Sequence, residues 1–151
     1  MPTLISIRRL LLALLVLGVT ATTVDLLLLA HYEEVKQLIP LGLNGLALAT
    51  ILWHVTAGGA ASIRVLQVVM LLFVVAGLVG TVLHYQGNLE FQMEINADQP
   101  AWDLFRKVMT AKAPPALAPG AMTQLGFLGL IYSYRHPSLS PATPAMKETE
   151  Q

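Results

Sequence analysis

The feature that most limits the fold of this chain is a long apolar run without a single charge, residues 65–83. A helix needs about 20 mostly apolar residues to cross the roughly 30 Å of hydrocarbon in a bilayer, and this run has that length. The composition agrees: 55% of the 151 residues are hydrophobic and only 12% are charged, whereas soluble domains carry about 25% charged residues. We therefore expect an integral membrane protein.

Three further apolar runs are long enough to be considered as spans: residues 10–30, 38–57 and 117–134. The first follows Arg8 and Arg9 and could instead be a cleaved signal peptide, because Val19-Thr20-Ala21 resembles a cleavage site. Its apolar character resumes after Asp25, which favours a retained span. The last run is the shortest. Together the four runs predict an all-α fold, an integral membrane four-helix bundle with a partly ordered outer loop, formed by a single transmembrane domain of residues 1–137.

The basic residues predict the orientation, because Lys and Arg concentrate on the cytoplasmic side of a membrane. With the N-terminus in the cytoplasm, the span ends on that side carry Arg8, Arg9, Arg64 and Arg135. Both termini are then cytoplasmic, and residues 84–116 form the long outer loop. Residues 138–151 are rich in Pro, Ser and charge, and we expect them to be a disordered cytoplasmic tail.

The outer loop contains a segment with two interpretations. In residues 89–96 apolar and polar residues alternate, which is the period of a strand. A lone strand has no partner to pair with, so we favour an outward continuation of the third helix. Farther along, Asp98 and Pro100 are suitable residues for a helix start. The spacing of Trp102, Phe105 and Met109 then predicts a short amphipathic helix on the outer membrane surface.

Polar residues inside the predicted spans are the first candidates for function, because such residues are costly in lipid. Asp25 and Asn44 should lie at similar depth in an antiparallel hairpin, and we expect a hydrogen bond between them, with Thr22 or Gln124 as a further partner. One hypothesis is that these residues hold helices together. The other is that Asp25 relays protons or cations, with Asn44 and Gln124 beside it.

A second candidate site lies on the outer side, where imidazole and carboxylate groups suit zinc, copper or iron. Its residues are His31, Glu34, His84, Glu90 and Glu94. No HxxxH, HExxH or ExxH spacing supports a metal, so we expect no cofactor, and metal binding is the alternative. Haem between His31 and His84 or between His54 and His136 is disfavoured because these histidines lie at helix ends. The chain has no cysteine, which excludes disulfides, thiolate metal sites and cysteine nucleophiles.

Small residues spaced four apart predict close helix packing. The pairs are Ala76 and Gly80, Gly77 and Thr81, and Gly129 and Ser133. Packing within the bundle and packing against a partner explain them equally well. We expect the chain to contact the lipid bilayer and either a membrane protein partner or further copies of itself. A net charge of zero gives no reason to expect nucleic acid.

Four short segments, HYEEVKQLIPL, HYQGNLEF, PALAPG and YRHP, are similar to those of an uncharacterised group of small bacterial inner-membrane proteins. The resemblance implies a four-helix protein of the bacterial inner membrane and implies no activity. The leading hypothesis is a non-enzymatic accessory or scaffold subunit of a membrane assembly. The alternatives are a small transporter or ion-coupled module that uses Asp25, and a metal-binding or redox protein that uses the outer His and Glu cluster.

Overall fold

Every regular element within residues 2–140, the part of the chain that the computed structural model describes, is a helix. Three of the helices are long and apolar enough to cross a membrane: α1 (Pro2–Leu28), α2 (Leu38–Ala57) and α3 (Ala60–Ile95). They overlap the first three predicted spans, the second with the predicted bounds, and α1 continues through Val19-Thr20-Ala21 without a break. The all-α prediction is confirmed, and the three helices indicate a membrane protein.

The fourth apolar run forms α5 (Gly120–Ser133), which has only 14 residues. Its length is about 21 Å at 1.5 Å per residue, which is less than the roughly 30 Å of the hydrocarbon. Pro119 precedes the helix, and Arg135 has a positive φ of 45° just after it. The predicted span of residues 117–134 is thus a helix, but a shorter one than α1, α2 or α3.

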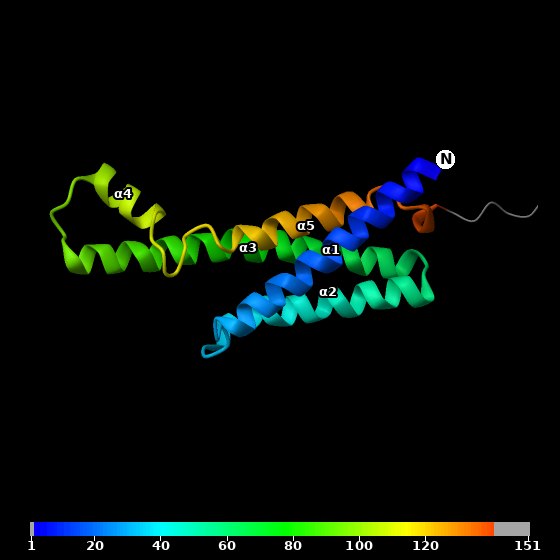
Figure 1. Ribbon diagram of the computed structural model, residues 1–151, viewed down its shortest axis with the longest axis horizontal. Helices are drawn as coiled ribbons and strands as arrows, with labels where there is room; N and C mark the ends of the chain where they lie inside the picture. Colours follow the sequence, from blue (N-terminus) through cyan, green and yellow to red (C-terminus); the bar gives the residue numbers. More distant parts are fainter. Residues whose placement is uncertain (1, 141–151) are drawn as a thin grey trace, which may run out of the picture.

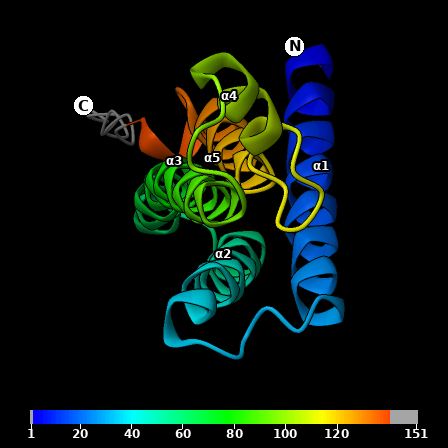
Figure 2. The ribbon, with the colours of Figure 1, turned by 90° about the vertical axis from the view of Figure 1, so that its left-hand side faces the viewer.

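The four apolar helices pack around one core (Figures 1 and 2). α2 and α3 are antiparallel neighbours, α5 lies along α3, and α1 crosses α2 and α5. Leu15 of α1, Ala47 of α2 and Phe73 of α3 are fully buried between the helices. Many leucines on the outer faces, such as Leu10 and Leu17 of α1, are exposed, as expected of side chains that face lipid.

A two-residue connection joins α2 to α3. Gly58 and Gly59 both have positive φ, 65° and 97°. Residues that have a Cβ atom are strained at positive φ. The two glycines therefore allow the chain to reverse direction without further residues.

Glycines also bring α3 and α5 unusually close together. A Cβ atom built on Gly77 would lie 2.6 Å from the backbone nitrogen of Thr123, and one built on Gly126 would lie 2.7 Å from the carbonyl oxygen of Met70. One built on Gly80 would lie 2.8 Å from the ring of Pro119. The small residues that the sequence singled out in this part of α3 therefore serve packing within the chain.

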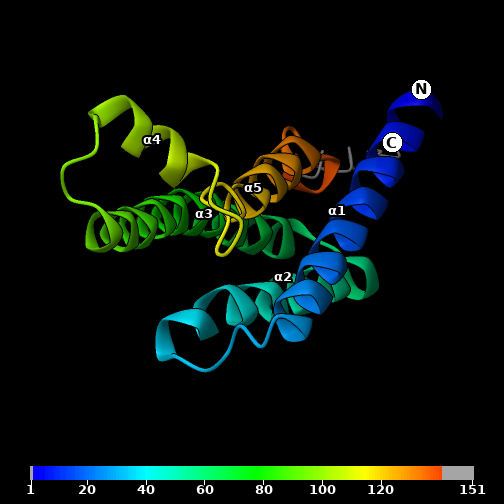
Figure 3. The ribbon, with the colours of Figure 1, turned by 60° about the vertical axis from the view of Figure 1, so that its left-hand side comes forward.

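α3 is longer than the other helices because it continues past the predicted span (Figure 1). Residues 89–95 belong to it, which confirms the helical interpretation of this segment. The short helix α4 (Ala101–Met109) lies beside this extension (Figure 3), with the Val108 side chain fully buried. The amphipathic helix expected on the membrane surface is therefore present, but it packs against α3.

Two short 3-10 helices complete the described chain: η1 (Val35–Gln37), before α2, and η2 (Pro137–Leu139), after α5. η2 falls at the start of the tail that was expected to be disordered. The rest of that tail, residues 141–151, lies outside the described residues.

Candidate functional site

The acidic residues are unevenly distributed between the two ends of the packed helices. Four arginines lie at the end where α1 begins and α5 ends, which we name the arginine end: Arg8, Arg9, Arg64 and Arg135. Every acidic residue of the described part lies toward the other end, which we name the acidic end. The candidate sites lie at these two ends, and α1, α2, α3 and α5 connect them.

A buried hydrogen-bond network lies at the arginine end and is centred on His54 of α2. The hydroxyl of Ser62 is 2.9 Å from the carbonyl oxygen of Gly59 and donates to it. The Ser62 oxygen therefore accepts from His54 Nδ1, which is 2.9 Å away. Nε2 of the neutral imidazole is then an acceptor, and the Tyr132 hydroxyl donates to it at 2.9 Å. The network ties α2 to both α3 and α5.

This hydrogen-bond pattern limits the chemistry that His54 can perform. In this tautomer Nδ1 of His54 donates to Ser62 and does not act as a base for its hydroxyl. The rings of His54 and His136 are in contact, with centroids 5.0 Å apart. Both ring nitrogens of His54 are hydrogen-bonded to side chains of neighbouring helices. The geometry suits helix association.

Arg8 of α1 binds the carboxyl end of α5. Its guanidinium donates to the carbonyl oxygens of Tyr132 at 2.7 Å, Tyr134 at 3.1 Å and Arg135 at 3.0 Å. These carbonyls lie in the last turn of the helix or just beyond it, where no helical N–H follows to bind them, and a cation there is favourable. Arg8 thus joins α1 to α5.

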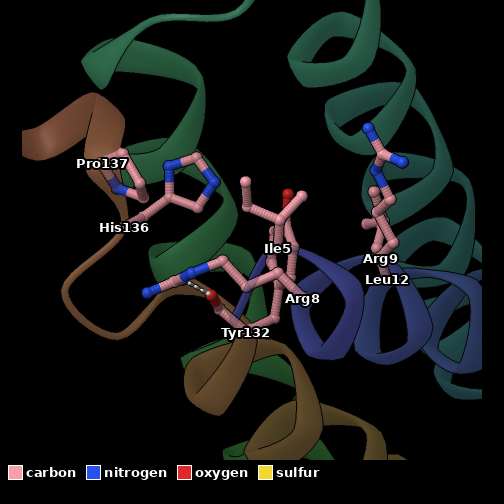
Figure 4. Close-up of a pocket in the computed structure, with 7 residues that line it drawn as sticks. All are labelled: Ile5, Arg8, Arg9, Leu12, Tyr132, His136 and Pro137. Carbon is pink, nitrogen blue, oxygen red and sulfur yellow. Dashed lines mark hydrogen bonds between the residues drawn. The ribbon is translucent and has the colours of Figure 1, made fainter. Parts of the chain in front are cut away.

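His136 lies beside this contact and lines a small pocket. The pocket has a volume of about 240 Å³ and lies between α1 and the residues that follow α5 (Figure 4). Nδ1 of His136 accepts a hydrogen bond from the backbone N–H of Ser138. Burial lowers the pKa of the His136 imidazole below its ordinary value of 6.5, and the nearby His54 and Arg8 lower this pKa further.

The polar residues predicted inside the spans are only partly brought together. Asn44 is fully buried, and its amide nitrogen donates to the hydroxyl of Thr22 at 3.3 Å. This contact replaces the expected hydrogen bond with Asp25, whose side chain is exposed, as is that of Gln124. The Asn44 Oδ1 atom is buried and has no hydrogen-bond partner among the described residues.

The predicted metal ligands at the acidic end are directed to other contacts or to the surface. Nδ1 of His84 donates to the carbonyl oxygen of Pro115 at 3.0 Å. Glu34, Glu90 and Glu94 are exposed. Within residues 2–140, no group of three or more His, Asp or Glu side chains is placed so that it could hold a metal ion.

The extension of α3 and the helix α4 form the most prominent feature of the acidic end, and we name residues 84–109 the α3–α4 projection. It carries large apolar side chains that no other described residue covers. Trp102 is 71% exposed and Ile95 is 65% exposed. Phe105 stacks on Trp102 with ring centroids 5.6 Å apart, and Phe91 is also exposed.

The sequence gives no sign of the network around His54, although His54 and His136 both lie at predicted span ends. A single tyrosine and a single serine carry no motif, so nothing in the sequence pattern points to Tyr132 and Ser62. Their role depends on contacts between helices that are far apart in the chain.

Comparisons with models of protein families, with curated proteins and with solved structures found no match for this chain.

Proposed function

We propose that this protein is a non-enzymatic accessory or scaffold subunit of a membrane assembly, and that it contacts its protein partner through the α3–α4 projection. It would form a four-helix bundle in the bacterial inner membrane. The observation that supports this role best is the group of exposed aromatic and aliphatic side chains on the projection, led by Trp102. Large apolar patches on a protein surface commonly mark interaction sites.

The length of α3 supports a position of this patch outside the lipid bilayer. If residues 65–83 cross the hydrocarbon, Ile95 lies about 18 Å beyond its edge at 1.5 Å per residue. The headgroup layer adds only roughly 5–8 Å on each side. The far end of α3 and the start of α4, which carries Trp102, therefore stand in water, where a protein partner is the natural cover for apolar surface.

The chemistry of the projection indicates what the partner surface should look like. Trp is among the residues that contribute most to protein interfaces, and the stacked Trp102 and Phe105 rings form a broad, rigid contact area. The projection carries exposed charges of both signs: Glu90, Glu94, Asp98 and Asp103 are acidic, and Arg106 and Lys107 are basic. We expect a partner with an apolar pocket and a rim that carries charges of both signs, because opposite charges guide association.

Photo-crosslinking in intact cells tests this proposal. A photoreactive amino acid at Phe91 should give a discrete protein adduct at natural expression levels. Adding Trp102→Ser should strongly reduce its yield, because Trp102 is part of the same surface. The matched control is the photoreactive residue at Leu52, which is exposed on α2 and is expected to face lipid. Equal adduct yields at the two positions, or no effect of Trp102→Ser, would contradict a partner site on the projection.

The orientation follows from the arginine end, which we expect to face the cytoplasm according to the positive-inside rule. Both chain termini are then cytoplasmic and the projection lies outside. Reporter fusions test this arrangement. A reporter active only in the periplasm should be inactive at the C-terminus and active when it is inserted between Ala97 and Asp98. The reverse result would invert the orientation and place the projection in the cytoplasm.

A second candidate function, an ion-coupled module, draws support from the unpaired Oδ1 atom of Asn44. A buried amide oxygen that accepts no hydrogen bond within the protein can accept one from a passing proton donor or can bind a cation. Asp25 follows Thr22, the partner of Asn44, by three residues on the same helix. Proteoliposomes containing Asp25→Asn should then lose the ion flux that the natural protein shows, and identical flux in the two preparations would exclude this function.

A further inference from the structure

We propose that α1 holds one anionic phospholipid, with the lipid phosphate at Arg9 and an acyl chain in the groove that leads from Arg9 to Thr20. This site lies at the arginine end, far from the α3–α4 projection, and does not depend on a protein partner.

Two hollows in the surface meet at Arg9. The first is the pocket of about 240 Å³ beside His136. The second has a volume of about 530 Å³ and runs along α1, lined by Arg9, Leu12, Ala13, Val16, Leu17 and Thr20. Both are lined by Arg9 and Leu12. The second hollow is a shallow groove on one face of α1, with the charged Arg9 at one end and mostly apolar side chains along the rest.

The dimensions of the groove match one leaflet of a bilayer. Its lining residues recur at spacings of three and four, so they share one face of the helix. From Arg9 to Thr20 the helix rises about 16 Å, which is close to half of the roughly 30 Å hydrocarbon thickness. An acyl chain that starts at the membrane surface beside Arg9 would therefore end near the bilayer centre beside Thr20.

Arg9 is available for a lipid phosphate, in contrast to its neighbour. Arg8 already donates three hydrogen bonds to carbonyls at the end of α5. Figure 4 shows the Arg9 side chain pointing away from that of Arg8. Within residues 2–140 Arg9 makes no hydrogen bond or ion pair, and all acidic residues lie toward the other end. A guanidinium at the membrane surface that has no counter-ion among residues 2–140 attracts the phosphate of an anionic lipid.

Charge also favours a lipid over a second copy of the chain on this face. Copies in one membrane have the same orientation, so a symmetric pair would place Arg9 against Arg9. No acidic side chain of the described chain lies nearby to compensate that repulsion. A zwitterionic lipid offers the same phosphate but adds a cationic headgroup beside the four arginines of this end.

Native mass spectrometry of the full-length protein in non-ionic detergent tests the proposal. Phosphatidylglycerol is titrated into the micelles, with phosphatidylcholine as the parallel probe, and bound lipids are counted. We expect one phosphatidylglycerol to be retained more strongly than phosphatidylcholine. Arg9→Gln should weaken phosphatidylglycerol binding about fivefold, the fold-change that corresponds to roughly 1 kcal/mol for one basic residue at a membrane surface.

Two further variants make the test specific. Arg64→Gln removes the same charge from an exposed position at the same end and should change binding less than twofold. Ala13→Trp, also at an exposed position, keeps the charge but fills the groove and should weaken phosphatidylglycerol binding. Equal losses for Arg9→Gln and Arg64→Gln, or equal retention of the two lipids, would overturn the site. So would displacement by millimolar inorganic phosphate, or a dimer that Ala13→Trp abolishes.

Discussion

Replacing Gly77 by alanine should separate α3 from α5 and destabilise the protein. The added Cβ would lie 2.6 Å from the Thr123 backbone nitrogen and 2.8 Å from the Pro119 carbonyl oxygen. Both atoms belong to the backbone, so a rotamer change cannot relieve the contact and α5 must shift. Overpacking of this kind costs about 1–3 kcal/mol. The gain from placing alanine instead of glycine in a helix, about 0.5–1 kcal/mol, offsets only part of that cost.

Gly87→Ala is the matched control, because Gly87 lies in the same helix and a Cβ there meets no atom within 4 Å. It should stabilise the protein by up to about 1 kcal/mol. Reversible unfolding in mixed micelles, followed by circular dichroism while the fraction of denaturing detergent is raised, measures both variants. The difference between them isolates the steric cost. If Gly77→Ala were as stable as Gly87→Ala, α3 and α5 would not approach as closely as described.

The residues around His54 and the buried Asn44 offer three further tests by the same unfolding assay. Tyr132→Phe removes the hydroxyl that donates to His54 and should lower the free energy of unfolding by about 1–2 kcal/mol, which a value near zero would contradict. The pKa of His136 is lowered in the folded protein, so the unfolded chain binds more protons as the pH falls below 6.5, and the free energy of unfolding should decrease there. His136→Asn should flatten this pH dependence. An unchanged slope would refute the role of His136. Asn44→Leu removes an amide whose oxygen has no partner, and it should change stability by less than about 1 kcal/mol; a loss of several kcal/mol would show that this oxygen is bonded.

The long helices could be predicted because their signal is local. α1, α2 and α3 each bring their own apolar length and satisfy their own backbone hydrogen bonds, so no knowledge of neighbours is needed. The extension of α3 past Gly87 was also predictable, since a lone strand at residues 89–96 would have lacked a partner. The start of α5 was harder to predict: the run was expected to be helical from residue 117, but the helix begins at Gly120, directly after Pro119.

The candidate sites were harder to predict because they depend on rotation and on distant contacts. Asp25 and Asn44 were paired by depth, but equal depth does not say which way each side chain turns about its helix axis. Asn44 faces Thr22 instead. The bond between His54 and Tyr132 joins residues 78 positions apart, and no spacing rule in one sequence connects them. Exposure of Trp102 likewise required the position of α4 relative to α3.

The bond between Arg8 and the end of α5 has a consequence for the order in which the protein is made. Its partners are separated by 124 to 127 residues, so α1 leaves the ribosome long before the carbonyls that will bind it. α2 and α3, joined by two glycines, can pair as soon as both are inserted. α1 acquires its contacts with α5 only when α5 has been synthesised, so a chain that stalls before Tyr132 holds its first helix through α2 alone.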